Sequence, residues 1–473
     1  MSLIYTLNGL LVQDLNGLVL VRLLSLIQII AAAYLCLSWF DKITGDRPRS
    51  LLLSVMTFTL PSFMVAVSWA GCSVDPPTIL LSILAAGFAR KTPFNKWRGL
   101  LSGKFWLAVL FFLLANLTYA AAAVFYWPLV FILFVEEQRK PVEERKGQFL
   151  TAGAAGIATY GIYAVILKII HWFSAANHLD LALPSVYNPH VINLDFIRKI
   201  VWFFREPFFN ALNLWNIFPN WLLPVLLALI AGAAYGIYLM KNGWQTLPRI
   251  IGMTFVFLLL SFFPNLMATS DLAFYRCLAG LGPLILLITY LLLNYILRAK
   301  GWDKFFTIIL FAGIIIGPIT ANQTIFKYRA LPSLIETNYF TQQFENIPLR
   351  QDVHLYYSGL DADPAAVRYD EFGTYTLNFL DDLAEIPVCF MRIKAKKENY
   401  LLAEVGTSQG CFIPQCQSVF FFWRHPGYPK ARFMSRIYVT TWLTRLPSEI
   451  SCPTRHISLF HLPGRYQGQP VLR

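Results

Sequence analysis

A few charged side chains stand beside or within the long apolar stretches of this 473-residue chain, and their types suit acid–base and phosphate chemistry. Charge within a bilayer is costly, so such residues are functional candidates. Asp14 and Arg22 are eight residues apart at the start of the first apolar stretch. A carboxylate that accepts a proton and a guanidinium that contacts phosphate would together suit an anionic, lipid-linked substrate. The alternative is a surface ion pair.

Asp75 and Arg276 lie in two short links between apolar stretches. Asp75 precedes two prolines, so capping the next helix is the alternative to an acid–base role. Arg276 is suited to bidentate contact with phosphate, and its alternative is anchoring at the membrane surface. The sequence therefore predicts catalytic candidates at Asp14 and Asp75, and donor phosphate-binding candidates at Arg22 and Arg276.

The stretch 172–220 is long for a link between apolar segments, and it is rich in charged and aromatic residues. Its part 194–215 has helical spacing and would lie flat in the headgroup layer. It could form one wall of a site for a polyprenyl chain, and mere interfacial anchoring is the alternative. The candidates for contact with acceptor or lipid are Asp195, Arg198, Trp202 and Arg205.

These residues must be positioned by membrane helices, because the composition excludes a water-soluble globule. Hydrophobic residues make up 56% of the chain and charged residues 14%, against about 25% charged in an ordinary soluble domain. The mean hydropathy is +0.53. Ten apolar segments follow from the pattern: 18–40, 50–70, 76–89, 105–117, 119–135, 149–171, 221–240, 250–264, 277–297 and 305–325. Several are shorter than the roughly 20 residues of a full span, which predicts broken or re-entrant helices.

The continuous apolar run 105–135 is interpreted as a tight helix hairpin that turns near 116–119. One long, tilted helix is the alternative.

The charge distribution predicts an orientation. The formal net charge is +13, yet residues 1–329 hold 25 Lys/Arg and 13 Asp/Glu, while residues 330–473 hold 14 and 13. Alternating sides place 17 Lys/Arg in one set of links and 4 in the other, which puts the first set inside and the C-terminal region outside. Nucleic acid is not expected as a partner. Residues 1–17 begin outside, so either a short N-terminus is translocated or a helix precedes this sequence; the second is favoured.

Residues 330–473 are predicted to form an extracytoplasmic domain, with a helix over 331–344 and strands over 353–357, 375–380, 388–393, 418–423, 436–442 and 456–462. Disulfides among Cys389, Cys411, Cys416 and Cys452 are allowed there, and free thiols are the alternative. The predicted fold is an α-helical polytopic membrane domain, 1–329, followed by an α/β or mostly β domain, 330–473.

Four stretches resemble bacterial integral-membrane glycosyltransferases of the GT-C superfamily, in particular the glucosyl transferase GtrII-like proteins. They are LVLVRLLSLIQ at 18–28, YAAAAVFYWPLVF at 119–131, KIVWFFREPFFNALNLWNIFP at 199–219 and FPNLMATSDLAFYRCLAG at 263–280. The resemblance implies location in the bacterial cytoplasmic membrane, a sugar donor on a polyprenyl phosphate and a cell-surface glycan or lipid as acceptor. It also implies a carboxylate base in the first outer loop and a cation beside the leaving phosphate. Asp14 is the one acidic residue of that loop present here.

Three functions compete at this point. The first, which the resemblance implies, is sugar transfer from a lipid-linked donor. The second is a flippase or transporter of a lipid-linked saccharide, although no inverted repeat is visible. The third is a non-catalytic membrane partner in assembly of envelope polysaccharide. The sequence identifies no cofactor besides the lipid-linked donor, and it leaves metal need and oligomeric state open.

Overall fold

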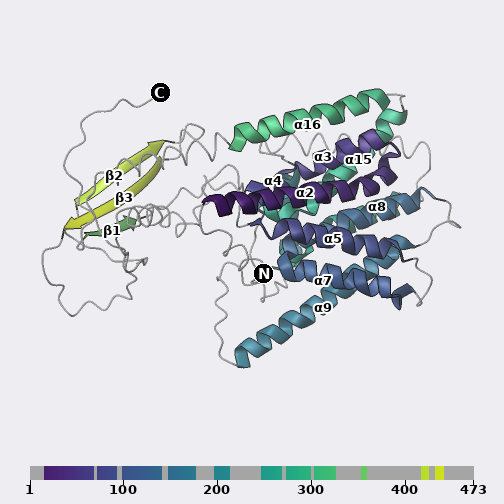
Figure 1. The fold of residues 1–473 in the computed structure, drawn as a ribbon, viewed down its shortest axis with the longest axis horizontal. Coiled ribbons are helices and arrows are strands. Elements are labelled where there is room, and N and C mark those ends of the chain that lie inside the picture. Colours follow the sequence, from purple (N-terminus) through teal and green to yellow (C-terminus); the bar gives the residue numbers. More distant parts are fainter. Residues whose placement is uncertain are drawn as a thin grey trace. The chain divides into compact units, whose positions relative to one another are not determined.

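The computed structural model shows a helical membrane unit and a three-stranded sheet (Figure 1). It describes residues 15–68, 72–92, 99–140, 147–176, 196–212, 247–268, 273–299, 303–325, 353–358, 417–424 and 432–441. The chain divides into two compact units, 1–323 with 369–371, and 324–368 with 372–473. The predicted segment 221–240, the helix 331–344 and the four C-terminal cysteines lie outside the described residues.

Nine of the predicted apolar segments coincide with helices. In chain order these helices are α2 (Leu15–Thr44), α3 (Arg47–Phe58), α4 (Pro61–Ser68), α5 (Asp75–Arg90), α7 (Gly103–Ala123), α8 (Tyr126–Gln138), α9 (Gln148–Ala176), α13 (Leu247–Leu260), α14 (Phe263–Met267), the 3₁₀ helix η5 (Tyr275–Leu278), α15 (Leu281–Ala299) and α16 (Asp303–Ile325). Figure 1 shows α2, α5, α7 and α8 side by side. The match has a physical cause. Apolar runs lie in lipid, where backbone N–H and C=O groups must form hydrogen bonds within the protein, and a helix satisfies them.

Three of the described helices are long and apolar enough to cross a membrane by themselves: Val19–Thr44, Gly103–Ala123 and Gln148–Ile170. The pair α3 and α4 qualifies as a fourth if it is one span bent by 59°. The apolar stretches Ile251–Leu260, Leu281–Leu297 and Thr307–Gly317 are shorter. The chain is therefore an integral membrane protein with three or four candidate spans in its described part.

The apolar run 105–135 is not one continuous helix, and it is interrupted where the turn was predicted. The backbone of Tyr119 is extended (φ −158°, ψ 99°) and divides α7 into two helical parts, so the predicted break near 116–119 is confirmed. Val124 and Phe125, between α7 and α8, keep right-handed helical dihedral angles. The rings of Phe112 and Tyr126 stack with centroids 4.2 Å apart across this region. One long helix, the alternative, is therefore excluded.

Four interruptions of helices meet in the interior of the unit: 59–60, 124–125, 261–262 and 279–280. We call these residues the break core. Its closest contacts are at Gly280, where an added Cβ would lie 2.6 Å from the Ser261 carbonyl oxygen and 2.8 Å from that of Val124. The rings of Phe58, Phe63 and Phe125 pack around the first two breaks, with centroids 4.8 to 5.6 Å apart.

The break core is expected to lie within membrane depth, because the helices that lead to it from the membrane surface are short. The twelve residues of α3 rise about 18 Å and the thirteen of α8 about 20 Å, whereas the hydrocarbon layer is about 30 Å thick. Non-helical backbone at that depth must be enclosed by protein. Val124, Ser261 and Phe262 are fully buried, which meets this requirement.

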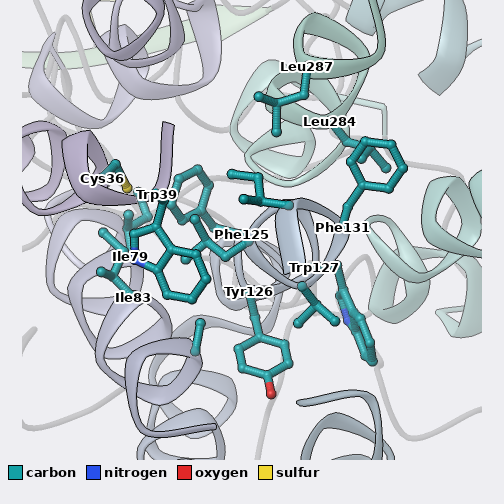
Figure 2. Close-up of a cluster of buried hydrophobic side chains, with 14 of the residues drawn as sticks. Cys36, Trp39, Ile79, Ile83, Phe125, Tyr126, Trp127, Phe131, Leu284 and Leu287 are labelled. Carbon is teal, nitrogen blue, oxygen red and sulfur yellow. The ribbon is translucent and has the colours of Figure 1, made fainter. Parts of the chain in front are cut away.

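Large side chains fill the interior beside the break core. Figure 2 shows Phe125, Tyr126 and Trp127 between residues of α2 and α5, such as Trp39 and Ile79, and residues of α15. The Tyr126 hydroxyl donates to the carbonyl of Ala152, and the Trp127 indole donates to the Tyr160 hydroxyl. The polar atoms of these rings are therefore satisfied within the bundle.

One end of the bundle, which we call the Lys42 end, is joined by ion pairs. Glu136 binds Lys42 of α2 and, at 2.8 Å, Lys140 of its own helix. Burial raises the pKa of the Glu136 carboxyl, but the hydrogen bonds from Lys140 and Lys42 outweigh it and hold the pKa below its usual value. Arg90, the last residue of α5, lies over the ring of Trp39 at 5.3 Å. The last residues of α2, α5 and α8 therefore meet here.

Neighbouring Glu137 performs a different task at the same end. Its buried carboxylate accepts hydrogen bonds from the backbone N–H groups of Gln148 and Phe149, at the start of α9. The residue thus caps a helix that begins eleven positions later, satisfying amides that have no partner within the helix. Burial raises the pKa of this carboxyl.

The C-terminal unit contains an antiparallel sheet in the order β1-β3-β2, formed by β1 (Val353–Ser358), β2 (Gln417–Arg424) and β3 (Arg432–Thr441). Three of the six predicted strands coincide with these. The other three lie outside the described residues.

Substituting Gly280→Ala should destabilise the protein by about 3 kcal/mol, because the new methyl group would meet two backbone carbonyls that cannot move apart freely. Gly252→Ala is the matched control, since an added Cβ there meets no atom within 4 Å. Unfolding in SDS, followed by circular dichroism, measures both. Equal stability of the two variants would contradict the close packing of the break core.

Substituting Glu136→Gln should cost about 1–2 kcal/mol, because it leaves the largely buried Lys42 ammonium without its carboxylate. Asp41→Asn is the control. The Asp41 pair with Arg47, at 2.9 Å, is more exposed and should contribute at most about 0.5 kcal/mol. The same unfolding assay compares them, and a larger loss from Asp41→Asn would refute the assignment.

Candidate functional site

Asp75 is a buried carboxylate at the end of α5 opposite Arg90, which we call the Asp75 end. It is the first residue of α5 and is only 3% exposed. Val74 occupies the N-cap position, so the predicted alternative in which Asp75 is itself the cap is wrong. The carboxylate still lies at the positive end of the helix dipole, which favours its charge. One helical turn along, Ile79 belongs to the buried cluster around Phe125 (Figure 2).

Arg276 lies in η5, directly before the break at 279–280. Its side chain is half-buried, with the guanidinium 5.3 Å from the centre of the Phe274 ring. The segment is held by side-chain amides from two directions: Asn210 donates to the carbonyl of Ala273 at 3.1 Å, and Asn265 to that of Cys277 at 3.4 Å. Because α4 contacts both α5 and η5, the segments of Asp75 and Arg276 share a neighbour.

The predicted amphipathic helix is two helices, α10 (Phe196–Arg205) and α11 (Pro207–Leu212). The break at Glu206 comes directly before Pro207, whose ring disfavours helical geometry in the residue before it. Trp202 is buried, and its indole donates to Glu206 at 2.9 Å. Arg198 and Arg205 are exposed, as are the apolar side chains of Ile197 and Val201.

Some of the predicted site residues lie on elements that pack together, and others lie elsewhere or outside the described residues. Asp75, Arg276 and Trp202 belong to elements packed around α4, α11 and η5. Arg22 is exposed, four residues into the span Val19–Thr44. Asp14 and Asp195 lie outside the described residues, so their predicted roles stay predictions.

A small pocket opens between these elements, beside the break core. It has room for one oxygen-sized group rather than a sugar ring. Its lining residues come from the α3–α4 break, α11, η5 and the start of α15: Leu60, Pro61, Ser62, Asn210, Ala211, Tyr275, Leu278 and Gly282. The pocket thus lies where the helix that leads towards Asp75 meets the segment that carries Arg276.

The described residues contain no cluster of three or more His, Cys, Asp or Glu side chains close enough to hold a metal ion. The three cysteines seen in this part, Cys36, Cys72 and Cys277, are free and buried. The chemistry available at the Asp75 end therefore consists of a carboxylate, a guanidinium, hydroxyls and side-chain amides.

Two features of this region were not predicted from the sequence. Lys199 is fully buried, and its ammonium lies 4.8 Å from the centre of the Trp202 ring, a cation–π distance. Ser62 is 5% exposed and lines the pocket. The Pro61 beside it was the available signal, because a proline inside an apolar run marks a helix break. The burial of Lys199 depends on tertiary packing and left no such signal.

Compared with models of known protein families, with curated proteins and with solved structures, the chain gives no match.

Proposed function

We propose that this membrane protein transfers a sugar, glucose by the resemblance described above, from a polyprenyl-phosphate donor to a cell-surface glycan or lipid acceptor. The observation that carries the proposal is the buried carboxylate of Asp75, which is not the N-cap of its helix. A buried carboxylate in a membrane protein is expensive and marks a functional site by default. The positive-inside count predicts that the Asp75 end faces the outer side of the membrane, where such a reaction would occur.

The chemistry assigned to each group is simple. The Asp75 carboxylate takes the proton of the acceptor hydroxyl while that oxygen attacks the anomeric carbon. The bond from the anomeric carbon to the phosphate oxygen breaks, and its electron pair leaves with the lipid phosphate. Arg276 stabilises the negative charge that develops there. A single displacement of this kind inverts the anomeric carbon.

The amphipathic helix α10 fits the same proposal. Its exposed Ile197 and Val201 can enter the acyl boundary while Arg198 and Arg205 reach lipid headgroups. A helix of this kind would guide a lipid-linked donor laterally towards the region of Arg276. Interfacial anchoring alone is the simpler use of the same features.

Replacing Asp75→Asn should lower sugar release from polyprenyl-phosphate-glucose about a hundredfold or more, because the general base is lost. Purified protein, the labelled donor and a membrane glycan extract make up the assay. Asp41→Asn, a carboxylate change at the Lys42 end, is the control and should keep full activity. Full activity of Asp75→Asn would refute the assigned base. Absence of turnover by the folded, unsubstituted protein with any lipid-linked donor would refute the enzyme.

A second candidate is a flippase of lipid-linked saccharides, and the break core favours it. Discontinuous helices that meet within membrane depth are a feature of transporters. In liposomes, a flippase would expose a fluorescent lipid-linked saccharide of the inner leaflet to an added quencher. Such movement without sugar release would support transport in place of transfer.

A further inference from the structure

The pocket beside the break core lies at the N-terminus of α15, a helix of 19 residues with no acidic residue in its first turn. The first amides of a helix have no carbonyl partner within the helix, and the helix dipole makes this end electropositive. Such an end binds phosphate when the space in front of it is open. Of the first four residues of α15, Pro283 has no N–H and Leu284 donates its own to the Gly280 carbonyl, which leaves the N–H groups of Leu281 and Gly282. Gly282, in the first turn, forms part of the pocket wall and leaves that space free.

Ser62 provides an independent observation at the same place. Its side chain is 5% exposed and lines the pocket, and its hydroxyl oxygen lies 4.0 Å from where a Cβ of residue 282 would stand. Among the residues that the structure describes, the Ser62 hydroxyl forms no hydrogen bond. Its oxygen is not one of the fully buried atoms without a partner, so a group that enters the pocket can reach it and accept its hydrogen bond.

The size and neighbours of the pocket define the ligand. The space accepts a single oxygen-sized group, and a phosphate can insert one of its oxygens while the rest stays outside. Asn210, whose Nδ2 is fixed by the carbonyl of Ala273, lies at the wall. Arg276 follows the lining residue Tyr275 in the chain and adds positive charge to this side of the unit.

We propose that a phosphate group binds in this pocket, at the N-terminus of α15 and the Ser62 hydroxyl, and that it belongs to the polyprenyl phosphate. The assignment to the lipid rests on the proposed function. The phosphate oxygen would accept hydrogen bonds from the Ser62 hydroxyl and from the N–H groups of Leu281 and Gly282. Ser62 and Gly282 are then binding residues, and Asp75 acts on the acceptor rather than on this phosphate.

Equilibrium binding of radiolabelled polyprenyl phosphate, which carries no sugar, tests the proposal. Ser62→Ala should weaken binding about tenfold, as expected for loss of one hydrogen bond to a charged group. Gly282→Ala should weaken it at least as much, since its methyl group would occupy the pocket at ordinary contact distances, 3.6 Å from Leu60 and 4.0 Å from Ser62. Gly252→Ala is the matched control and should bind normally.

Each outcome decides a separate question. Unchanged affinity of Ser62→Ala and Gly282→Ala, with thermal midpoints equal to that of the unsubstituted protein, would overturn the site. So would polyprenol binding as tightly as polyprenyl phosphate. Inorganic phosphate binding at least as tightly as the lipid would overturn the lipid assignment. Because the probe has no sugar, loss of binding in the two variants supports the pocket even if no sugar transfer is ever observed. If the protein transfers sugar but the two variants bind the probe normally, the pocket is refuted and the proposed function is not.

Discussion

The shielding of backbone polar groups from lipid is the constraint on which the rest of this structure depends. Helices interrupted within membrane depth expose carbonyl and N–H groups that hydrocarbon cannot satisfy. Here four interruptions meet in one buried place, and Gly280 allows two of them to approach within contact distance of a third. Large rings then close the space around them. The breaks are therefore mutually dependent, and none would be tolerable alone on a lipid-facing surface.

The same arrangement separates the two ends of the bundle by chemistry. At the Lys42 end, two carboxylates have structural roles: Glu136 binds two lysines and Glu137 caps α9. The Asp75 end has a buried carboxylate, a half-buried guanidinium and a serine hydroxyl that bonds to no described residue. This asymmetry is the basis for placing the proposed reaction at the second end and a stability role at the first.

The positions of helices were predictable because apolar runs and prolines are local signals. The segment 250–264, too short for a full span, was expected to be broken, and it is divided into α13 and α14. The break between α3 and α4 within 50–70 was not predicted, although Pro61 marks it. The run 105–135 is likewise interrupted beside the predicted turn, at Tyr119. The contact of Gly280 with the backbone of Val124 was not predictable, because it joins residues far apart in the chain. For the same reason nothing in the sequence indicated that Lys199 is buried, and the alternative in which Asp75 caps its helix was wrong by one residue.

The most direct test of the account is a cryo-electron microscopy structure of the protein in nanodiscs with a non-hydrolysable polyprenyl-phosphate sugar. The account predicts density for the phosphate beside Ser62 and Gly282, with the sugar on the side of Asp75 and the polyprenyl chain leaving towards α10. Lipid phosphate bound at the Lys42 end, or a sugar that lies away from Asp75 while the phosphate pocket is filled by protein, would contradict it.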